Sequence, residues 1–322
     1  MISFFKLIRY QNLLIIAATQ YLMRYFIIKP FLALNGFSLQ LNEFHFFLLV
    51  LTTVLIASAG YVINDYFDVK TDSINKPEDV VIDKVISRRS AIAMHTVMST
   101  SGILLGVYLS WYVGVLPLSF IFFLCSGLLW FYSTTYKRQL LIGNLVVSFM
   151  IAGVPLLVAV YEIPLLNKEY GNIMLLNQVS FNYIFHWIAG FSFFAFLTNL
   201  IREIVKDTED FEGDNAYGMN TIPIYFGIKY TKVIVGSLIV ISIISIVLLM
   251  KYIVFSGESI DYLTAGYFTL FLIFPFIILF IRIIKAKSKD DYHKASSLLK
   301  FIMLTGIMYA FVVRYIVTYQ IN

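Results

Sequence analysis

Long apolar runs restrict what this chain can fold into more than any other feature of the sequence. Ordinary soluble domains carry about 25% charged residues, whereas only 13% of these 322 residues are charged and 60% are hydrophobic. Apolar runs of about 20 residues are long enough to cross a bilayer, and these lack the alternation that marks a transmembrane β-strand. We therefore predict an all-α, polytopic membrane bundle that forms a single domain over residues 1–322. It should contain about nine transmembrane helices, near 12–34, 43–64, 91–112, 115–136, 141–162, 183–203, 229–250, 262–284 and 299–319.

The distribution of Lys and Arg predicts how these helices are oriented. Most basic residues fall at the N-terminus and in every second connection, whereas the opposite connections hold only Lys168 and Lys251. The positive-inside rule then places the N-terminus in the cytoplasm. We expect a cell (inner) membrane protein, in contact with the lipid bilayer, whose polar site faces the cytoplasm. Arg24 and Arg314 fall within apolar runs, where each is expected to pair or to reach the interface.

Acidic residues are concentrated at the predicted inner ends of two helices. The segment from Asn64 to Asp72 reads NDYFDVKTD, and the segment from Lys206 to Asp214 reads KDTEDFEGD. In both, three aspartates stand at positions i, i+3 and i+7, which lie within about 60° on one face of a helix. These aspartates are Asp65, Asp68 and Asp72 in the first motif, and Asp207, Asp210 and Asp214 in the second.

Carboxylates stacked on one helical face repel each other and call for cations. Mg²⁺ is a hard cation that takes one or two carboxylates together with phosphate oxygens. One acidic segment after a membrane helix is usually a solvated connection, but two segments with matched spacing on the same side favour a metal site. We therefore predict a Mg²⁺–diphosphate site at the inner edge of the membrane. The sequence lacks a dense basic face for nucleic acid and indicates no obligate protein partner.

Basic residues flank both acidic motifs. Anchoring at the cytoplasmic interface accounts for most of them. Lys137 and Arg202 lie where predicted helices reach the acidic segments, and we expect them to contact phosphate. Arg88 follows the first motif and Lys206 belongs to the second, so both are further candidates for binding the substrate.

At these residues the sequence resembles the UbiA superfamily of intramembrane prenyltransferases. The segment from Asn64 to Asp72 matches the first family signature, N-D-x-x-D-x-x-x-D, at every defined position. The segment from Arg202 to Asp214 resembles the second signature, in the form of the branch that makes digeranylgeranylglyceryl phosphate. Two further segments also resemble the family. Arg9 to Asn12 resembles the R-x-x-N sequence that opens its first membrane helix, and Tyr132 to Lys137, followed by Gly143-Asn144, resembles the corner between its fourth and fifth membrane helices.

The resemblance implies both a reaction and a set of residues. The six aspartates, with Asn64, would hold two Mg²⁺ ions bridged by the diphosphate of a prenyl donor, and would be the catalytic residues. The loops at about 65–90 and 204–228 would close over the site as a lid and keep water away. Substrate binding would involve Asn12, Asn64, Tyr132, Lys137, Arg202, Lys206 and Arg88.

The sequence differs from that branch directly after the first motif. Where the branch has an Arg-Pro pair, this chain has Asp79-Val80, and Asp83-Lys84-Val85 replaces a Ser-Gly-Arg stretch. This difference leaves the metal ligands untouched and concerns the acceptor and the length of the donor.

Three functions are therefore compared. The leading one is Mg²⁺-dependent geranylgeranyl transfer to a membrane-soluble acceptor of the geranylgeranylglycerol phosphate type. The second is prenylation of an aromatic quinone precursor of the 4-hydroxybenzoate, homogentisate or naphthoate type. The third is a cation transporter with duplicated acidic sites, although a transporter site is expected near the midplane of the membrane.

Overall fold

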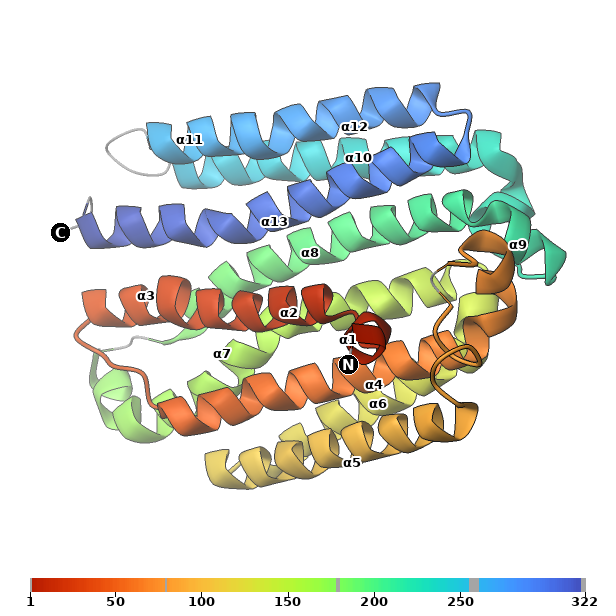
Figure 1. The fold of residues 1–322 in the computed structure, drawn as a ribbon. Helices are drawn as coiled ribbons and strands as arrows, with labels where there is room; N and C mark the ends of the chain where they lie inside the picture. Colours follow the sequence, from red (N-terminus) through yellow and green to blue (C-terminus); the bar gives the residue numbers. More distant parts are fainter. Residues whose placement is uncertain (1, 79, 178–179, 255–260, 320–322) are drawn as a thin grey trace. The chain divides into compact units, whose positions relative to one another are not determined.

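The computed structural model describes residues 2–78, 80–177, 180–254 and 261–319. Within these ranges every regular element is a helix, and one isolated bridge joins Ile82 to Ile86 (Figure 1). The elements in chain order are α1 (Ile2–Leu7), α2 (Tyr10–Leu22), η1 (Met23–Ile28), α3 (Lys29–Leu34), α4 (Glu43–Asn75), α5 (Arg88–Val113), η2 (Leu116–Leu118), α6 (Ser119–Thr134), η3 (Tyr136–Arg138), α7 (Ile142–Asn177), α8 (Asn182–Glu209), α9 (Phe211–Ala216), α10 (Ile222–Val254), α11 (Tyr262–Phe268), η4 (Thr269–Ile273), α12 (Phe274–Lys285) and α13 (Lys289–Tyr319).

The helices match the predicted membrane spans. In the described part of the chain, 8 helices are long and apolar enough to cross a bilayer. The predicted span at 12–34 is also helical, as α2, η1 and α3, but it is not among the eight. It carries buried Thr19, Gln20 and Arg24, which lower its hydropathy. The prediction of an all-α multi-pass membrane protein is confirmed.

The chain groups into two compact units. Unit 1 contains Met1–Lys137 and Gly153–Gly190, and unit 2 contains Arg138–Ala152 and Phe191–Asn322. The first aspartate motif belongs to unit 1 and the second to unit 2, so each motif is described with its own unit.

Close helix packing in both units depends on a glycine. In unit 1 a Cβ at Gly106 of α5 would lie 2.1 Å from the ring of Phe122 on α6. In unit 2 a Cβ at Gly306 of α13 would lie 2.1 Å from the ring of Phe194 on α8. Small residues that let helices approach closely are typical of membrane bundles, where lipid removes most of the hydrophobic driving force between helices.

Both acidic segments are largely helical. Helix α4 continues to Asn75 and α5 begins at Arg88, which leaves 76–87 as the connection after the first motif. After the second motif, α9 ends at Ala216 and α10 begins at Ile222. The segments 65–90 and 204–228, expected to close over the site as a lid, are therefore largely helical, and the aspartates of both motifs lie on helices or at the junction between them.

A buried ion pair lies in unit 1 near the N-terminal end of α4. The guanidinium of Arg24, which is 1% exposed, donates to Glu162 Oε2 at 3.0 Å, and Glu162 is fully buried. Glu162 Oε1 also accepts from the backbone N–H of Leu41 at 3.2 Å. Arg24 is therefore paired within the protein and does not extend to the interface.

Candidate active site

The first motif occupies one face of α4 close to its C-terminal end. Asp65, Asp68 and Asp72 follow one another at steps of three and four residues along a continuous helix. Asp68 is 4% exposed, while Asp65 and Asp72 are half-buried. The predicted helical face is thus present, with its central carboxylate the most deeply buried.

Arg9 balances the charge of Asp65. The Arg9 guanidinium donates to Asp65 Oδ1 at 2.8 Å and lies 5.1 Å from the centre of the Tyr61 ring. Arg9 has φ 51°, a left-handed conformation between α1 and α2 that directs the chain into α2. Burial lowers the pKa of Arg9, but Asp65, together with Tyr61 and Asp68, raises it by more, so the pKa lies above its usual value. A cluster of buried residues packs this segment against α4 and the following connection: Leu7, Ile8, Leu13, Val62, Ile82 and Ala91.

Lys137 balances the charge of Asp68. It lies on η3, directly after α6, and its ammonium donates to Asp68 Oδ2. Burial lowers the pKa of Lys137, but Asp68 in particular, with Tyr132 and Asp72, raises it by more. The lysine is therefore held charged beside the central aspartate of the motif, where we expected a phosphate-binding group.

Oxygen ligands suited to a hard cation remain at the first motif. Asn64 Oδ1 is buried and accepts no hydrogen bond from the described residues. It lies on α4 one residue before Asp65, among carboxylates that are also hard oxygen donors. The donor set of the first motif therefore fits Mg²⁺.

The other predicted residues of unit 1 lie in less enclosed positions. Asn12 is half-buried on α2, and its backbone N–H donates to Arg9 O at 2.8 Å. Tyr132 is half-buried on α6, near Lys137. Arg88 is exposed, donates to Asp83 Oδ2 at 2.8 Å and lies 5.1 Å from the centre of the Tyr66 ring. Asp79, noted above for its departure from the family pattern, is outside the described residues.

The second motif crosses a break between two helices. Asp207 lies on α8 and Asp214 on α9, whereas Asp210 occupies the junction. The backbone N–H of Asp210 donates to Lys206 O at 2.8 Å, and that of Asp214 donates to Asp210 O at 3.1 Å. The helical hydrogen-bond ladder therefore passes through the junction and keeps the predicted spacing. Asp214 is 5% exposed, so this motif also has a buried carboxylate.

An amide, rather than a cation, contacts Asp207. Asn144, near the start of α7, donates from Nδ2 to Asp207 Oδ2 at 2.8 Å. Glu203 and Asp214 add negative charge around Asp207, and Lys206 adds positive charge. Arg202 donates to its neighbour Glu203 at 3.0 Å, and its buried Nε has no hydrogen-bond partner among the described residues. The predicted residues of unit 2 therefore gather on the last turns of α8 and on α9.

Within the ranges that the structure describes, neither aspartate motif gathers enough His, Cys, Asp or Glu side chains around one point to coordinate a metal ion by themselves. Among the described residues, no group of three or more His, Cys, Asp or Glu side chains is arranged to hold a metal ion. In Mg²⁺ sites, substrate phosphates and waters supply much of the coordination.

Two residues of the site were absent from the predicted set. Arg9 and Asn144 contact Asp65 and Asp207, and each lies far from its partner in sequence. The sequence did contain signals for them: Arg9 belongs to the R-x-x-N segment and Asn144 to the Gly143-Asn144 segment, and both segments resemble the family.

The comparisons with known proteins cover most of the chain. The model of the UbiA prenyltransferase family matches residues 30–305. A digeranylgeranylglyceryl phosphate synthase of Methanobrevibacter smithii is 33% identical over 276 residues, which cover 85% of this chain and 87% of that protein. The enzyme of the same name from Korarchaeum cryptofilum is 30% identical over 256 residues, which cover 79% of this chain and 80% of that protein.

Solved structures agree with the fold. A structure described for digeranylgeranylglyceryl phosphate synthase in membranes has a TM-score of 0.60 at 24% identity, and the match covers 96% of this chain and 98% of that one. A UbiA homologue from Archaeoglobus fulgidus, bound to DMAPP and Mg²⁺, has a TM-score of 0.55 at 15% identity, with 98% and 99% covered. The resemblance seen in the two motifs is thus confirmed: this chain belongs to the UbiA prenyltransferase family and is a multi-pass membrane prenyltransferase.

Proposed function

We propose that this enzyme transfers a geranylgeranyl group from geranylgeranyl diphosphate to geranylgeranylglyceryl phosphate. The observation that carries the proposal is the 33% identity to a digeranylgeranylglyceryl phosphate synthase over 85% of this chain. The arrangement of each aspartate motif, with a buried carboxylate and a nearby basic side chain, supports the same reaction.

The six aspartates and Asn64 are the residues proposed to hold Mg²⁺. Their donors are all hard oxygens, and Asn64 Oδ1 is buried with no described partner. The A. fulgidus homologue was solved with DMAPP and Mg²⁺, which supports the same ion here; two ions bridged by diphosphate are part of the proposal. When bound, Mg²⁺ would neutralise the charge that develops on the departing diphosphate.

The basic side chains are proposed to bind the diphosphate and orient it. Lys137 already stands beside Asp68, and Arg202 and Lys206 belong to the last turns of α8. The allylic C–O bond of the donor breaks with its electron pair on the diphosphate. The acceptor hydroxyl then forms the new C–O bond, and its proton leaves with the diphosphate.

The arrangement of charge favours an enzyme over a cation transporter. On α4 the aspartates begin at residue 65 of a helix that runs from Glu43 to Asn75, so they lie toward one end of the helix. A transporter site is expected near the midplane. We also propose that the N-terminus and both motifs face the cytoplasm, because the basic residues follow the positive-inside pattern. A cysteine placed at Lys84, in the 76–87 connection, should then react with an impermeant thiol reagent only from the cytoplasmic side.

Activity measured in membranes tests the reaction. Membranes that contain the enzyme should release diphosphate from geranylgeranyl diphosphate only when Mg²⁺ and geranylgeranylglyceryl phosphate are present, and mass spectrometry should find the doubly prenylated lipid. Asp68→Ala and Asp210→Ala should each reduce the rate by about 10³-fold or more. Full activity in both variants would refute the metal assignment, and a prenylated aromatic product would refute the proposed acceptor.

A further inference from the structure

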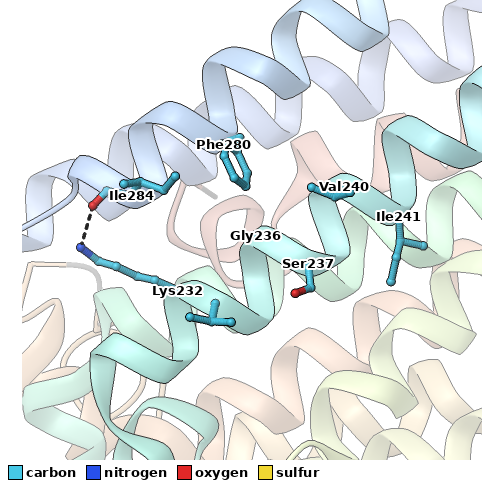
Figure 2. Close-up of a pocket in the computed structure, with 8 residues that line it drawn as sticks. Lys232, Gly236, Ser237, Val240, Ile241, Phe280 and Ile284 are labelled. Carbon is cyan, nitrogen blue, oxygen red and sulfur yellow. Dashed lines mark hydrogen bonds between the residues drawn. The ribbon is translucent and has the colours of Figure 1, made fainter.

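A groove in unit 2 lies outside both aspartate motifs. It has a volume of about 610 Å³ and is lined by one face of α10, from Lys232 to Ile241, together with Phe280 and Ile284 of α12 (Figure 2). Most of its lining is apolar, and Val233, Val240, Ile241 and Ile284 are exposed. The groove therefore opens onto the surface that a membrane helix presents to lipid.

Gly236 gives the groove its depth. A Cβ at this position would lie 3.2 Å from the Phe280 ring, which is tighter than ordinary packing. Ser237, the next residue on α10, is also small. In Figure 2 the helix backbone at Gly236 is bare below the Phe280 side chain, between Lys232 on one side and Val240 and Ile241 on the other. A larger residue at Gly236 would fill this part of the groove.

A lysine marks the polar end of the groove. Lys232 Nζ donates to Ile284 O at 3.1 Å and to Ala286 O at 2.5 Å, which satisfies carbonyl groups at the C-terminal end of α12. An ammonium has three N–H donors, so these two carbonyls leave capacity for one more acceptor. The lysine is thus held in place by α12 at the mouth of an apolar groove.

The stretches of α10 and α12 that form this end carry charges of one sign. The segments 222–240 and 274–287 contain no Asp or Glu and five basic residues, which are Lys229, Lys232, Arg282, Lys285 and Lys287. The next acidic residues have local partners, since Asp290 pairs with Lys294 and Asp291 accepts from Ser288. The basic end of the groove therefore complements an anionic group.

The length of the groove matches one lipid chain in one leaflet. From Lys232 to Ile241, α10 rises by about 14 Å, which is close to half of a ~30 Å hydrocarbon core. Basic pockets between membrane helices on the cytoplasmic side are a general way to bind anionic lipid headgroups.

We propose that this groove binds an anionic phospholipid of the surrounding membrane. Its phosphate contacts Lys232 and the neighbouring basic side chains, and one of its chains lies over Gly236 between α10 and Phe280. This site is distinct from the prenyl transfer site and does not depend on the substrate proposed above.

Native mass spectrometry of the purified full chain in detergent tests the proposal. The protein is titrated with phosphatidylglycerol or with phosphatidylcholine of the same chain length. The wild type should bind one phosphatidylglycerol in preference to phosphatidylcholine. Lys232→Gln should weaken that binding roughly fivefold, and Lys232→Arg should restore most of it. Lys251→Gln, at the opposite end of the same helix, is the matched control and should bind as the wild type does.

Gly236→Leu tests the apolar part of the site separately from the charge. It should reduce binding of phosphatidylglycerol while Lys232 stays in place, and circular dichroism should confirm that the variant is folded. If it does not fold, Ser237→Phe fills the same groove from an exposed position. Equal binding of both lipids by the wild type, or no change in Lys232→Gln, would overturn the proposal. Displacement of phosphatidylglycerol by geranylgeranyl diphosphate would also overturn it, because the groove would then belong to the substrate.

Discussion

The two aspartate motifs have the same spacing, but Asp207 of the second motif contacts a group of different charge from those that contact Asp65 and Asp68 of the first. In the first motif, Arg9 and Lys137 place cations on Asp65 and Asp68. In the second, the contact to Asp207 comes from the neutral amide of Asn144. A cation that pairs with a carboxylate must move or be shared when a metal binds, whereas an amide adds no charge that competes with the metal. The difference suggests that the first motif exchanges protein cations for metal and phosphate, whereas the amide that contacts Asp207 carries no charge to be displaced.

Among the substitutions that test this comparison, one at Lys137 should have the largest effect on activity. If it transfers its contact from Asp68 to the diphosphate, Lys137→Met should lower kcat/KM by about 10²-fold or more, since truncating one partner of a buried charge pair costs about 2–5 kcal/mol. Steady-state kinetics with geranylgeranyl diphosphate would measure the loss. Arg138→Met, the exposed neighbour, is the control and should keep wild-type kinetics. Wild-type kinetics in Lys137→Met would show that the lysine serves only the metal-free fold.

In the absence of metal, neutralising an aspartate should change the stability of the protein differently in the two motifs. Asp68→Asn leaves Lys137 beside a neutral group, and should lower the free energy of unfolding in EDTA by about 1–3 kcal/mol. Asp207→Asn keeps an acceptor for Asn144 and removes a partly buried acidic group near Glu203 and Asp214, so it should leave stability unchanged or raise it by up to about 1 kcal/mol. Thermal unfolding in detergent would measure both. Equal destabilisation by the two variants would remove the contrast between the motifs.

The Arg9 contact should matter less than the Lys137 contact. The Arg9 and Asp65 side chains are 37% and 21% exposed, so solvent weakens their attraction. Arg9→Gln should reduce metal-free stability by no more than about 1 kcal/mol, and raised salt should remove most of the difference from the wild type. A loss as large as that of Asp68→Asn would indicate that Arg9 holds the α4 face as firmly as Lys137 does.

Arg88 should give the smallest effect. Its guanidinium is exposed and paired with Asp83, so Arg88→Gln should change kcat/KM by less than about fivefold. The same assay as for Lys137 measures it. A drop near that of Lys137→Met would support Arg88 as a substrate-binding residue, as the sequence predicts.

The sequence predicted the fold and the motifs well because both depend on local patterns. Apolar runs of membrane length and a helical spacing of acidic residues can be read from neighbouring positions. The contacts of Arg9 with Asp65 and of Asn144 with Asp207 join positions 56 and 63 residues apart, and no local pattern reports such pairs. For the same reason the sequence could not tell whether Arg24 pairs or extends to the interface, since its partner Glu162 is 138 residues away.

The sequence also could not show how far helix α4 continues into the first acidic segment. A run of Asp and Lys after an apolar segment is typical of a solvated connection, and 65–90 was expected to close over the site as a lid. Helix α4 instead continues through Asp72 to Asn75, because Arg9 and Lys137 offset the repulsion on its acidic face. Such compensation comes from residues on other elements and becomes visible only in the folded chain.

Calorimetric titration of Mg²⁺ into the purified enzyme, with an unreactive geranylgeranyl diphosphate analogue present, tests the central claim most directly. The account predicts saturable Mg²⁺ binding by the wild type that is lost in Asp68→Asn and in Asp207→Asn, while the control Asp83→Asn keeps it. Undiminished Mg²⁺ binding in both motif variants would contradict the claim that the two aspartate motifs hold the metal.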